Sequence, residues 1–350
     1  MDRASAAPLY AALDLGTNNC RLLIARPAAA KAAVPGAPPF VVVDAFSRIV
    51  RLGEGVSQTG RLSDAAMDRA IEALKVCAAK LRRRPVAAAR MVATEACRRA
   101  ANCAEFLARV KAETGLAVET ITTAEEAALA LAGCAPLLDG ATPEALVFDI
   151  GGGSTELMWA KLGAPGSDRE RGEPQLLDFL SLPYGVMNLA EREDCDCLSR
   201  EQFEGLIAQV QEKAEAFEAR HAIRARIESG HLQMLGTSGT VTTLAGIRMG
   251  LACYDRSRVD GCHLDFAELR AVTDRLLALD CKARAQEPCI GPARADLVLA
   301  GCAILEAICR TWPVGRLRVA DRGVREGILL TLMRAAVPRA PEIPAAIPAE

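Results

Sequence analysis

Two phrases of similar make-up contain the residues of this chain that are best suited to chemistry. Residues 12–25 and 147–158 each hold an apolar run, an aspartate, a tight turn of glycine and small polar residues, and a second apolar run. This order predicts strand, turn, strand. A single copy would fit any ordinary hairpin. Two copies predict related half-molecules that face each other across a cleft, with Asp14 and Asp149 at strand ends on its two sides.

Both turns have the composition of a phosphate cradle. Glycines allow successive backbone N–H groups to converge on an oxyanion, and hydroxyl and amide side chains add donors. The candidate donors are Gly16, Thr17, Asn18, Gly151, Gly152, Gly153, Ser154 and Thr155. The carboxylates of Asp14 and Asp149 suit Mg²⁺, which binds through one or two carboxylates together with water and substrate phosphate. The competing interpretation is a pair of unrelated hairpins.

A third turn of small residues, 236–240, lies between a predicted strand and the start of a predicted helix. Helix N-termini bind anions, so Ser238 and Gly239 are further candidates for phosphate binding. The chain contains neither Gly-x-x-x-x-Gly-Lys-Ser/Thr nor Gly-x-Gly-x-x-Gly, which excludes the P-loop and Rossmann types of nucleotide site.

Carboxylates are the candidates for proton transfer, because the three histidines lie outside all of these turns. Glu156 directly follows the second turn, and Glu125 and Glu126 begin a predicted helix. The alternative for the helix-start pair is a complement to the helix dipole, a common use of glutamate in a first turn. The sequence alone leaves both interpretations of this pair open.

Arginines near the turns could add positive charge to the cleft. They are Arg21, Arg48, Arg51, Arg98, Arg322 and Arg325. Several guanidinium groups that converge would hold a polyanion by charge-assisted hydrogen bonds; the alternative for each is a solvated surface charge. The net charge of −2 provides no global basic field, so we expect no nucleic-acid partner.

The elements expected to position these residues follow the same order in both halves. In the first half we predict strands over 9–14, 20–26 and 40–46, a helix over 64–84, a strand over 90–94, a helix over 103–114, a strand over 117–121 and a helix over 124–137. In the second half we predict strands over 145–149, 155–160 and 175–181, a long helix opened by the capping box Ser199–Gln202, a strand over 232–235, helices over 265–279 and 294–310, a strand over 316–320 and a helix over 323–335. This order predicts an α/β fold of two lobes, over 1–138 and 139–337, with a hinge near 138–143 and a disordered tail over 338–350.

Cysteine usage and hydropathy bear on the compartment. The thirteen cysteines are odd in number, most lie in apolar segments, and no secretory segment precedes them. We therefore expect reduced thiols and a cytoplasmic location. No apolar run approaches the ~20 residues that span a bilayer, so no membrane association is expected.

Seven phrases, taken in order, resemble the signatures of the exopolyphosphatase/guanosine pentaphosphate phosphohydrolase family, which has a duplicated actin-like fold. They lie at 12–19, 51–55, 92–98, 125–127, 149–156, 236–240 and 321–327. The resemblance covers roughly residues 9–335. It is to the short form, because the helical HD-type domain of longer relatives has no counterpart after the two actin-like halves.

The resemblance implies roles for individual residues. Glu126 would be the general base that deprotonates the attacking water, and Glu156 would orient that water or help to hold the metal. Asp149, with Asp14 opposite, would bind Mg²⁺ or Mn²⁺. Arg98 would contact substrate phosphate, and Arg21 is a further candidate for that role. A homodimer is common among relatives and is expected here.

Two departures from the family pattern concern substrate preference. The family places arginine after Glu-Glu-Ala, whereas this chain has Ala128, which would leave a cation missing beside the base. The first turn has Asn19 and Cys20 where serine and an aromatic residue are usual. The main prediction is an exopolyphosphatase. The alternatives are a guanosine pentaphosphate hydrolase, a low-turnover sensor that binds guanosine tetraphosphate, and an ATP-dependent sugar or acetate kinase.

Overall fold

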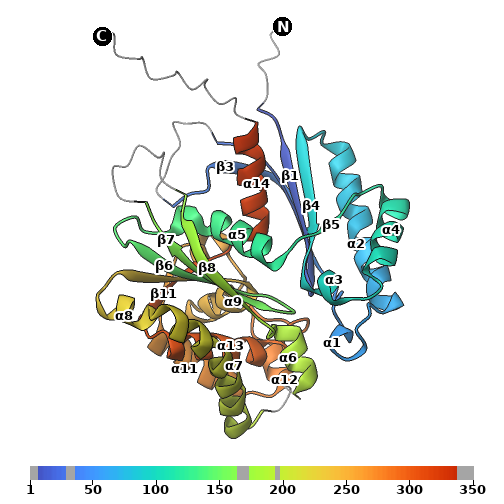
Figure 1. Ribbon diagram of the computed structural model, residues 1–350. Helices are drawn as coiled ribbons and strands as arrows, with labels where there is room; N and C mark the ends of the chain where they lie inside the picture. The colour runs from blue at the N-terminus through green and yellow to red at the C-terminus, as the bar shows by residue number, and fades with distance from the viewer. Residues whose placement is uncertain (1–6, 29–35, 164–172, 194–197, 337–350) are drawn as a thin grey trace, which may run out of the picture.

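The computed structural model describes residues 7–28, 36–163, 173–193 and 198–336. The predicted tail over 338–350 lies outside the described residues. Figure 1 shows two lobes, each built on a sheet, with two helices between the sheets. None of the described helices is both long enough and apolar enough to cross a membrane.

The two sheets repeat one strand order. Sheet one runs β3-β2-β1-β4-β5 and consists of β1 (Tyr10–Leu15), β2 (Asn19–Pro27), β3 (Phe40–Ile49), β4 (Ala88–Ala93) and β5 (Glu119–Thr120). Sheet two runs β8-β7-β6-β9-β11-β10 and consists of β6 (Glu144–Ile150), β7 (Thr155–Lys161), β8 (Gln175–Leu182), β9 (Leu232–Thr237), β10 (His263–Asp265) and β11 (Arg316–Ala320). In each, an antiparallel three-strand meander is followed by two parallel strands, and sheet two ends with β10, which pairs antiparallel with β11. The predicted duplicated α/β fold of two lobes is confirmed.

Helices cover the outer face of each sheet. On the first lobe these are α2 (Asp64–Arg83) and α4 (Cys103–Thr114); on the second they include α7 (Arg200–His221), α9 (Gly239–Arg248), α11 (Phe266–Leu277) and α13 (Val298–Thr311). One apolar face of α2 packs inward, because Ala70, Leu74 and Cys77 are buried in the core of the first lobe. Ser63 caps this helix by accepting a hydrogen bond from the Ala66 amide.

Short helices are the main difference from the predicted elements. They are α1 (Val56–Thr59), α3 (Glu95–Arg99), α6 (Val186–Arg192), α8 (Ile223–Glu228), α10 (Arg256–Val259) and α12 (Cys281–Ala285). Each is too short to show a helical period in the sequence. The helix predicted over 124–137 is α5 (Thr123–Cys134), which continues as a 3₁₀ turn over 135–137 that contains Pro136.

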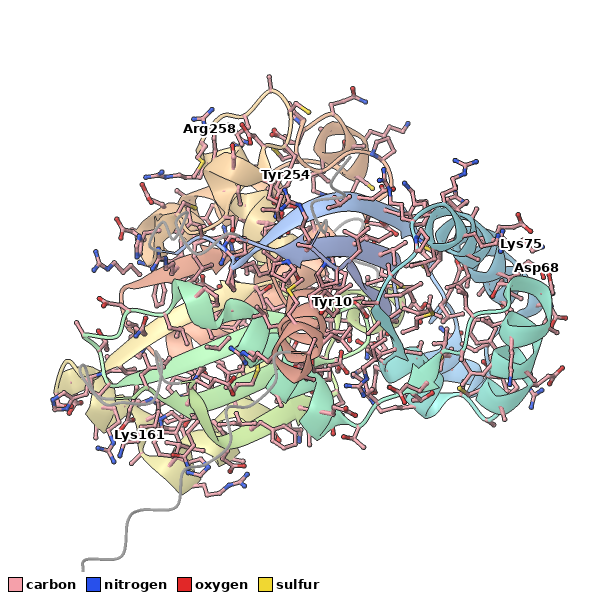
Figure 2. The ribbon with its side chains drawn as sticks, turned by 90° about the horizontal axis from the view of Figure 1, so that it is seen from above. Tyr10, Asp68, Lys75, Lys161, Tyr254 and Arg258 are labelled. Carbon is pink, nitrogen blue, oxygen red and sulfur yellow. The ribbon has the colours of Figure 1, made fainter. Side chains whose placement is uncertain are left out.

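Two helices from different halves of the sequence fill the space between the sheets. α5 and α14 (Val324–Ala335) cross at glycines: a Cβ on Gly133 would lie 2.1 Å from the Gly323 carbonyl oxygen, and one on Gly327 would lie 2.0 Å from that of Leu129. Together they bury a core that draws on both sheets. Figure 2 shows Tyr10 of β1 near the middle of the molecule, and this residue belongs to that shared core.

Candidate active site

The two predicted hairpin turns have matching backbones. In the first, the Gly16 amide donates to the Asn19 carbonyl at 2.9 Å. In the second, the Gly151 amide donates to the Ser154 carbonyl, also at 2.9 Å. The strand registers match as well, because Asp14 pairs with Arg21 across β1 and β2, and Asp149 pairs with Glu156 across β6 and β7. Arg21 and Glu156 therefore occupy equivalent positions in the two lobes.

The turns meet tip to tip at the base of the cleft. A Cβ on Gly153 would lie 2.8 Å from Thr17 Oγ1, and one on Gly152 would lie 3.1 Å from the Asn18 amide nitrogen. Larger residues in the second turn would push the lobes apart. The glycines of this turn thus have a packing role in addition to the predicted binding role.

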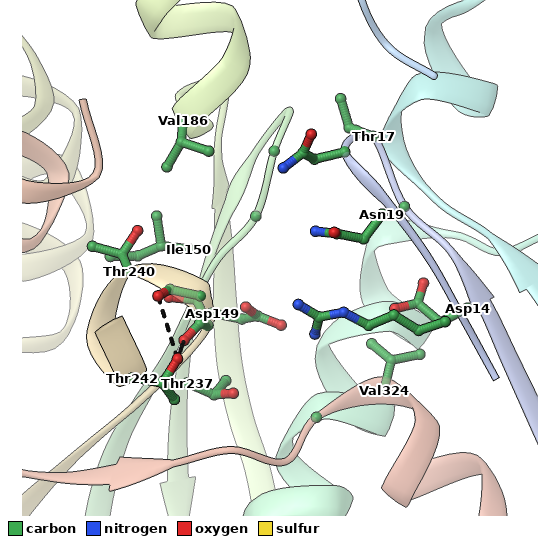
Figure 3. Close-up of a pocket in the computed structure, with 18 of the residues that line it drawn as sticks. Asp14, Thr17, Asn19, Asp149, Ile150, Val186, Thr237, Thr240, Thr242 and Val324 are labelled. Carbon is green, nitrogen blue, oxygen red and sulfur yellow. Dashed lines mark hydrogen bonds between the residues drawn. The ribbon is translucent and has the colours of Figure 1, made fainter. Parts of the chain in front are cut away.

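A cavity of about 480 Å³ lies between the lobes and is lined by both turns. Figure 3 shows Asp14, Thr17 and Asn19 on one side and Asp149, Ile150 and Thr240 on the other. Within the described residues, the backbone N–H groups of the turn tips donate no hydrogen bond; these are Thr17, Asn18, Gly152 and Gly153. Because buried or half-buried N–H groups are nearly always paired, unpaired ones at a cavity wall indicate an anion site.

The third turn completes one wall of the cavity. Ser238 and Gly239 line it, and Gly239 begins α9, so the N-terminus of this ten-residue helix borders the cavity. The backbone of Ser238 has a φ of 134°, a value that residues other than glycine rarely adopt. The Ser238 hydroxyl accepts a hydrogen bond from the Val241 amide. This places the predicted third anion site beside the other two turns.

Glu126, the predicted base, lies at the cavity wall in the first turn of α5. Its side chain is 13% exposed, and its Oε2 accepts a hydrogen bond from Arg98 Nη1 at 2.6 Å. Its Oε1 accepts none within the described residues. Burial and the nearby Glu156 carboxylate raise the pKa of Glu126 well above its usual range, and Arg98 only partly offsets this. A raised pKa is what a carboxylate general base at neutral pH requires.

Glu156 differs from the prediction in its position. It is not among the residues that line the cavity; it lies behind the wall, buried, and its Oε1 accepts from the hydroxyls of Ser154 (2.7 Å) and Ser181 (3.0 Å). Burial raises its pKa, and these two hydrogen bonds lower it. Glu156 therefore orients Ser154, which does line the cavity. Thr155 is also displaced from its predicted role, because its hydroxyl donates to the Tyr184 carbonyl behind the turn.

Arg98 is directed to carboxylates, in contrast to its predicted contact with phosphate. Its Nε and Nη2 donate to Glu95 Oε2 at 3.1 and 2.9 Å, and its Nη1 donates to Glu126 and to the Ile121 carbonyl. It is not among the cavity-lining residues. The physical reason is that two acidic side chains within reach neutralise it before any substrate is bound.

Glu95 is a site residue that sequence reasoning missed. It lines the cavity from the start of α3, its side chain is 17% exposed, and its Cγ would lie 2.9 Å from a Cβ on Gly153. Its only sequence signal was membership of the 92–98 phrase. A glutamate in the first turn of a helix is more often a complement to the helix dipole, so its type did not distinguish it.

The two aspartates fit a cation site. Neither carboxylate accepts a hydrogen bond from the described residues, although both line the cavity. Burial, followed by the charges of Glu156 and Asp14, raises the pKa of Asp149 to about 7. Burial also raises the pKa of Asp14, and Arg21 opposes this. Two such carboxylates suit Mg²⁺, which takes water and substrate phosphate as its other ligands. The described residues contain no cluster of three or more side chains that could hold a metal ion by themselves.

Arginines supply positive charge to the same cavity. Those that line it are Arg21, Arg256, Arg294, Arg322 and Arg325. No ion pair or hydrogen bond from a described residue engages the guanidinium of Arg21 or Arg294. Burial, followed by repulsion from Arg325, lowers the pKa of Arg21. Guanidinium groups that line a cavity and have no partner among the described residues, as in Arg21 and Arg294, are arranged as expected of a site that binds a polyanion.

Two other predicted arginines lie outside the cavity lining. Arg48 stacks over the ring of Phe46, and Arg51 forms an ion pair with Asp296 at 2.8 Å. The second contact joins the two lobes. A parallel interlobe contact is made by Glu191, which accepts from the Gly55 amide (3.0 Å) and the Ser57 hydroxyl (2.7 Å).

Ala128 does not leave a gap beside the base. It is exposed and does not line the cavity, since it lies two residues after Glu126 and therefore on another face of α5. The expectation of a missing cation next to Glu126 is therefore wrong. Asn19, by contrast, lines the cavity, whereas Cys20 is buried behind it.

These features define a two-lobed α/β protein whose interlobe cavity is lined by unpaired turn N–H groups, a glutamate with a raised pKa and two aspartates that accept no hydrogen bond from the described residues. The Ppx/GppA phosphatase family model matches residues 30–336. Exopolyphosphatase 2 of Mycobacterium tuberculosis is 32% identical over 339 residues, which is 92% of this chain and 98% of that protein. The chain belongs to the Ppx/GppA phosphatase family.

Solved structures agree in fold. An exopolyphosphatase-like protein has a TM-score of 0.79 at 29% identity, covering 94% of this chain and 100% of that one. The Aquifex aeolicus member of the Ppx/GppA family has a TM-score of 0.73 at 27% identity, covering 95% of this chain and 99% of that one. The likeness therefore extends over both lobes.

Proposed function

We propose that this chain is a Mg²⁺-dependent exopolyphosphatase that releases orthophosphate from the end of inorganic polyphosphate. One observation carries the proposal: a carboxylate base with a raised pKa, Glu126, lines the same cavity as two facing turns whose N–H groups are unpaired. An anion held by those turns would lie beside the base. The name of the Mycobacterium tuberculosis relative supports the choice of substrate.

The residues divide the reaction between them. The terminal phosphoryl oxygens would accept hydrogen bonds from the turn N–H groups, while the rest of the phosphate chain would lie against Arg21, Arg294 and Arg325. The unoccupied Oε1 of Glu126 would take a proton from water as the water attacks the terminal phosphorus and the bridging oxygen leaves. Catalysis of this kind depends mainly on positioning and charge stabilisation.

Asp14 and Asp149 would hold the metal. When bound there, Mg²⁺ would neutralise charge on the phosphate oxygens. Arg98 restrains Glu126 through its other oxygen, so that the base keeps one orientation. Ser154, oriented by Glu156, adds a hydroxyl to the cavity wall.

A second candidate is guanosine pentaphosphate 5′-phosphohydrolase, and one observation favours it. Part of the cavity wall is apolar or aromatic: Tyr254, Ile290, Leu297 and Val298 line it near Arg256 and Arg294. A phosphate chain is too polar to pack against such an apolar surface, whereas the base and sugar of a nucleoside would bury it. The two candidates share the phosphate cradle and the base, and differ in what occupies this wall.

The test compares phosphate release from polyphosphate and from guanosine pentaphosphate by the purified protein with Mg²⁺ and no acceptor. We expect release from polyphosphate. We expect Glu126→Gln to lose about 10²–10⁴-fold in kcat, the usual size of a general-base contribution, with an unchanged circular dichroism spectrum. Glu125→Gln is the matched control, because that neighbour pairs with Arg90 and does not line the cavity.

Three outcomes would contradict the proposal. Full turnover by Glu126→Gln would show that Glu126 is not the general base. Phosphate transfer that requires an acceptor would indicate a kinase. Tight binding of guanosine tetraphosphate with negligible release from either substrate would indicate a sensor.

A further inference from the structure

Arg51 joins two parts of the molecule that the proposed reaction uses, although it does not line the cavity. Its backbone amide donates to the Asn18 carbonyl of the first turn at 3.0 Å. Its Nη2 reaches the second lobe, where it donates to the Ala293 carbonyl at 3.2 Å and pairs with Asp296 Oδ2 at 2.8 Å. The residue therefore connects the first turn to residues 293–296.

The side chain of Arg51 extends from a backbone conformation that favours glycine. Its φ is 46°, in the left-handed region, which other residues adopt mainly where their surroundings hold them. The surroundings do so here: the Val50 amide also donates to the Asn18 carbonyl at 2.8 Å, and Arg69 donates to the carbonyls of Val50 and Arg51 at 2.9 and 3.2 Å. An arginine at such a position indicates a use for its side chain.

The two partners of Arg51 flank Arg294, which lines the cavity. On the C-terminal side, the Arg294 carbonyl accepts from the amides of Leu297 at 3.0 Å and of Val298, the first residue of α13, at 3.1 Å. All hydrogen bonds and ion pairs that described residues of the first lobe make to 293–296 come from Arg51. Without them the turn would stay attached to α13 but would lose the restraint on the direction of the Arg294 side chain.

We propose that Arg51 is a positioning residue for the substrate: from the first lobe it fixes residues 293–296, and so holds the Arg294 guanidinium toward the phosphate chain. The inference rests on the proposed function, in which Arg294 lies against that chain. Because neither Arg51 nor Asp296 lines the cavity, both act on the chain through Arg294. The contact spans the two lobes, so Arg294 would be held in place only while the cleft is closed.

The test measures KM and kcat of the full-length protein for polyphosphate, and the Kd for polyphosphate without Mg²⁺ by isothermal titration calorimetry. Arg51→Asn is the main variant, because asparagine tolerates a positive φ and is too short to reach the second lobe. KM and Kd should rise about fivefold, the effect of one net hydrogen bond, and kcat should stay unchanged. Tm should change little, since a partly exposed ion pair contributes little to stability.

Asp296→Ala separates positioning from simple attraction of charge. Removal of a negative charge would by itself tighten the binding of a polyanion, whereas loss of positioning would weaken it. We expect KM and Kd to rise as in Arg51→Asn. Arg294→Gln should raise both by about tenfold. Arg51→Asn should add nothing further in the Arg294→Gln background, because the two changes act on the same group.

Glu191→Ala is the matched control for closure of the cleft. It breaks the other contact between the lobes, with the Gly55 amide and the Ser57 hydroxyl, which does not involve residues 293–296. It should leave KM and Kd unchanged.

Each contrary result has a distinct meaning. Tighter binding by Asp296→Ala, or a full effect of Arg51→Asn in the Arg294→Gln background, overturns the positioning role. An equal rise in KM for Glu191→Ala overturns it as well, because closure of the cleft would then be the cause. If the wild-type protein binds polyphosphate but releases no phosphate, the proposed function fails, while the Kd values still decide the role of Arg51. A wild-type protein that does not bind polyphosphate overturns both.

Discussion

The two hairpins that face each other across the cleft have the same turn hydrogen bond and the same strand register, yet they differ at one paired position. Opposite Asp14 the first lobe has Arg21, which lines the cavity. Opposite Asp149 the second lobe has Glu156, which lies behind the wall. The first hairpin therefore contributes positive charge to the cavity, and the second contributes a buried negative charge near the base. In the proposed reaction both turns would hold the anion, but Arg21 would add positive charge from the first hairpin, whereas Glu156 of the second would raise the proton affinity of the base.

Removing the charge of Glu156 should have the largest effect. Glu156→Gln keeps an oxygen for Ser154 but removes the carboxylate that raises the pKa of Glu126. The pKa of Glu126 should fall, so the acidic limb of the kcat profile should move to lower pH. A weaker base should also lower kcat by about 100-fold over most of the pH range. Kinetics over a pH series measures both.

Ser181→Ala is the matched control for Glu156, because it removes one hydrogen bond to this carboxylate and leaves its charge in place. It should change kcat far less and should not move the acidic limb to lower pH. If Glu156→Gln also leaves the limb in place, the negative charge has no influence on the base and the contrast between the hairpins disappears.

Removing the charge of Arg21 should instead weaken binding. Arg21→Gln should raise KM for polyphosphate by about tenfold, since a hydrogen bond to a charged group contributes about 1.5–3 kcal/mol, and should leave kcat nearly unchanged. Arg48→Gln is the control, because that side chain stacks on Phe46 outside the cavity. A fall in kcat at unchanged KM would place Arg21 with the reacting groups and would contradict the division between the hairpins.

The smallest expected effect concerns the thermal stability of the protein, which should respond differently to substitution of Asp149 and of Asp14. On folding, the pKa of Asp149 rises from 3.8 to about 7, so between these values the folded state holds a proton that the unfolded state has released. The stability contribution of this group is therefore complete below about pH 4 and is lost as pH rises through about 7. Without divalent cations, Asp149→Asn should raise Tm by several degrees at pH 8, and the gain should vanish toward pH 4.

Asp14→Asn is the comparison for this measurement. It should gain less, because Arg21 opposes the rise in the pKa of Asp14 and the substitution removes that attraction. Thermal melts by circular dichroism over the pH series would show both effects. A Tm difference for Asp149→Asn that is independent of pH would mean that the buried charge is not its cause.

The fold was largely predictable because its long elements carry strong local patterns. The helix predicted over 64–84 is α2 at Asp64–Arg83, and the paired turns were recognisable from their glycines. The site was predictable only in part. α3 and Glu95 have no periodic signal in five residues. Arg256 and Arg294 reach the cavity from parts of the chain far from any turn, so no local pattern indicates them.

The errors at the site share a physical cause. Arg98, Thr155 and Glu156 were correctly placed near the turns, but sequence gives no account of which neighbour uses their polar atoms first. Glu95 and Glu126 engage Arg98, the Tyr184 carbonyl engages Thr155, and two serine hydroxyls engage Glu156. Such competition is decided by packing in three dimensions.

The glycine crossing of α5 and α14 sets how the cleft can move. Gly133 and Gly327 bring the two backbones together between the sheets, and the helices bury a core that belongs to both lobes. Any relative rotation of the lobes that keeps this contact would turn about the helix pair. At the rim, far from this pair, the same rotation would separate Glu191 from Ser57 and Arg51 from Asp296. With such a rotation, the cleft would open to a long anion once these polar contacts at its rim are broken, and the shared core between the sheets would stay closed.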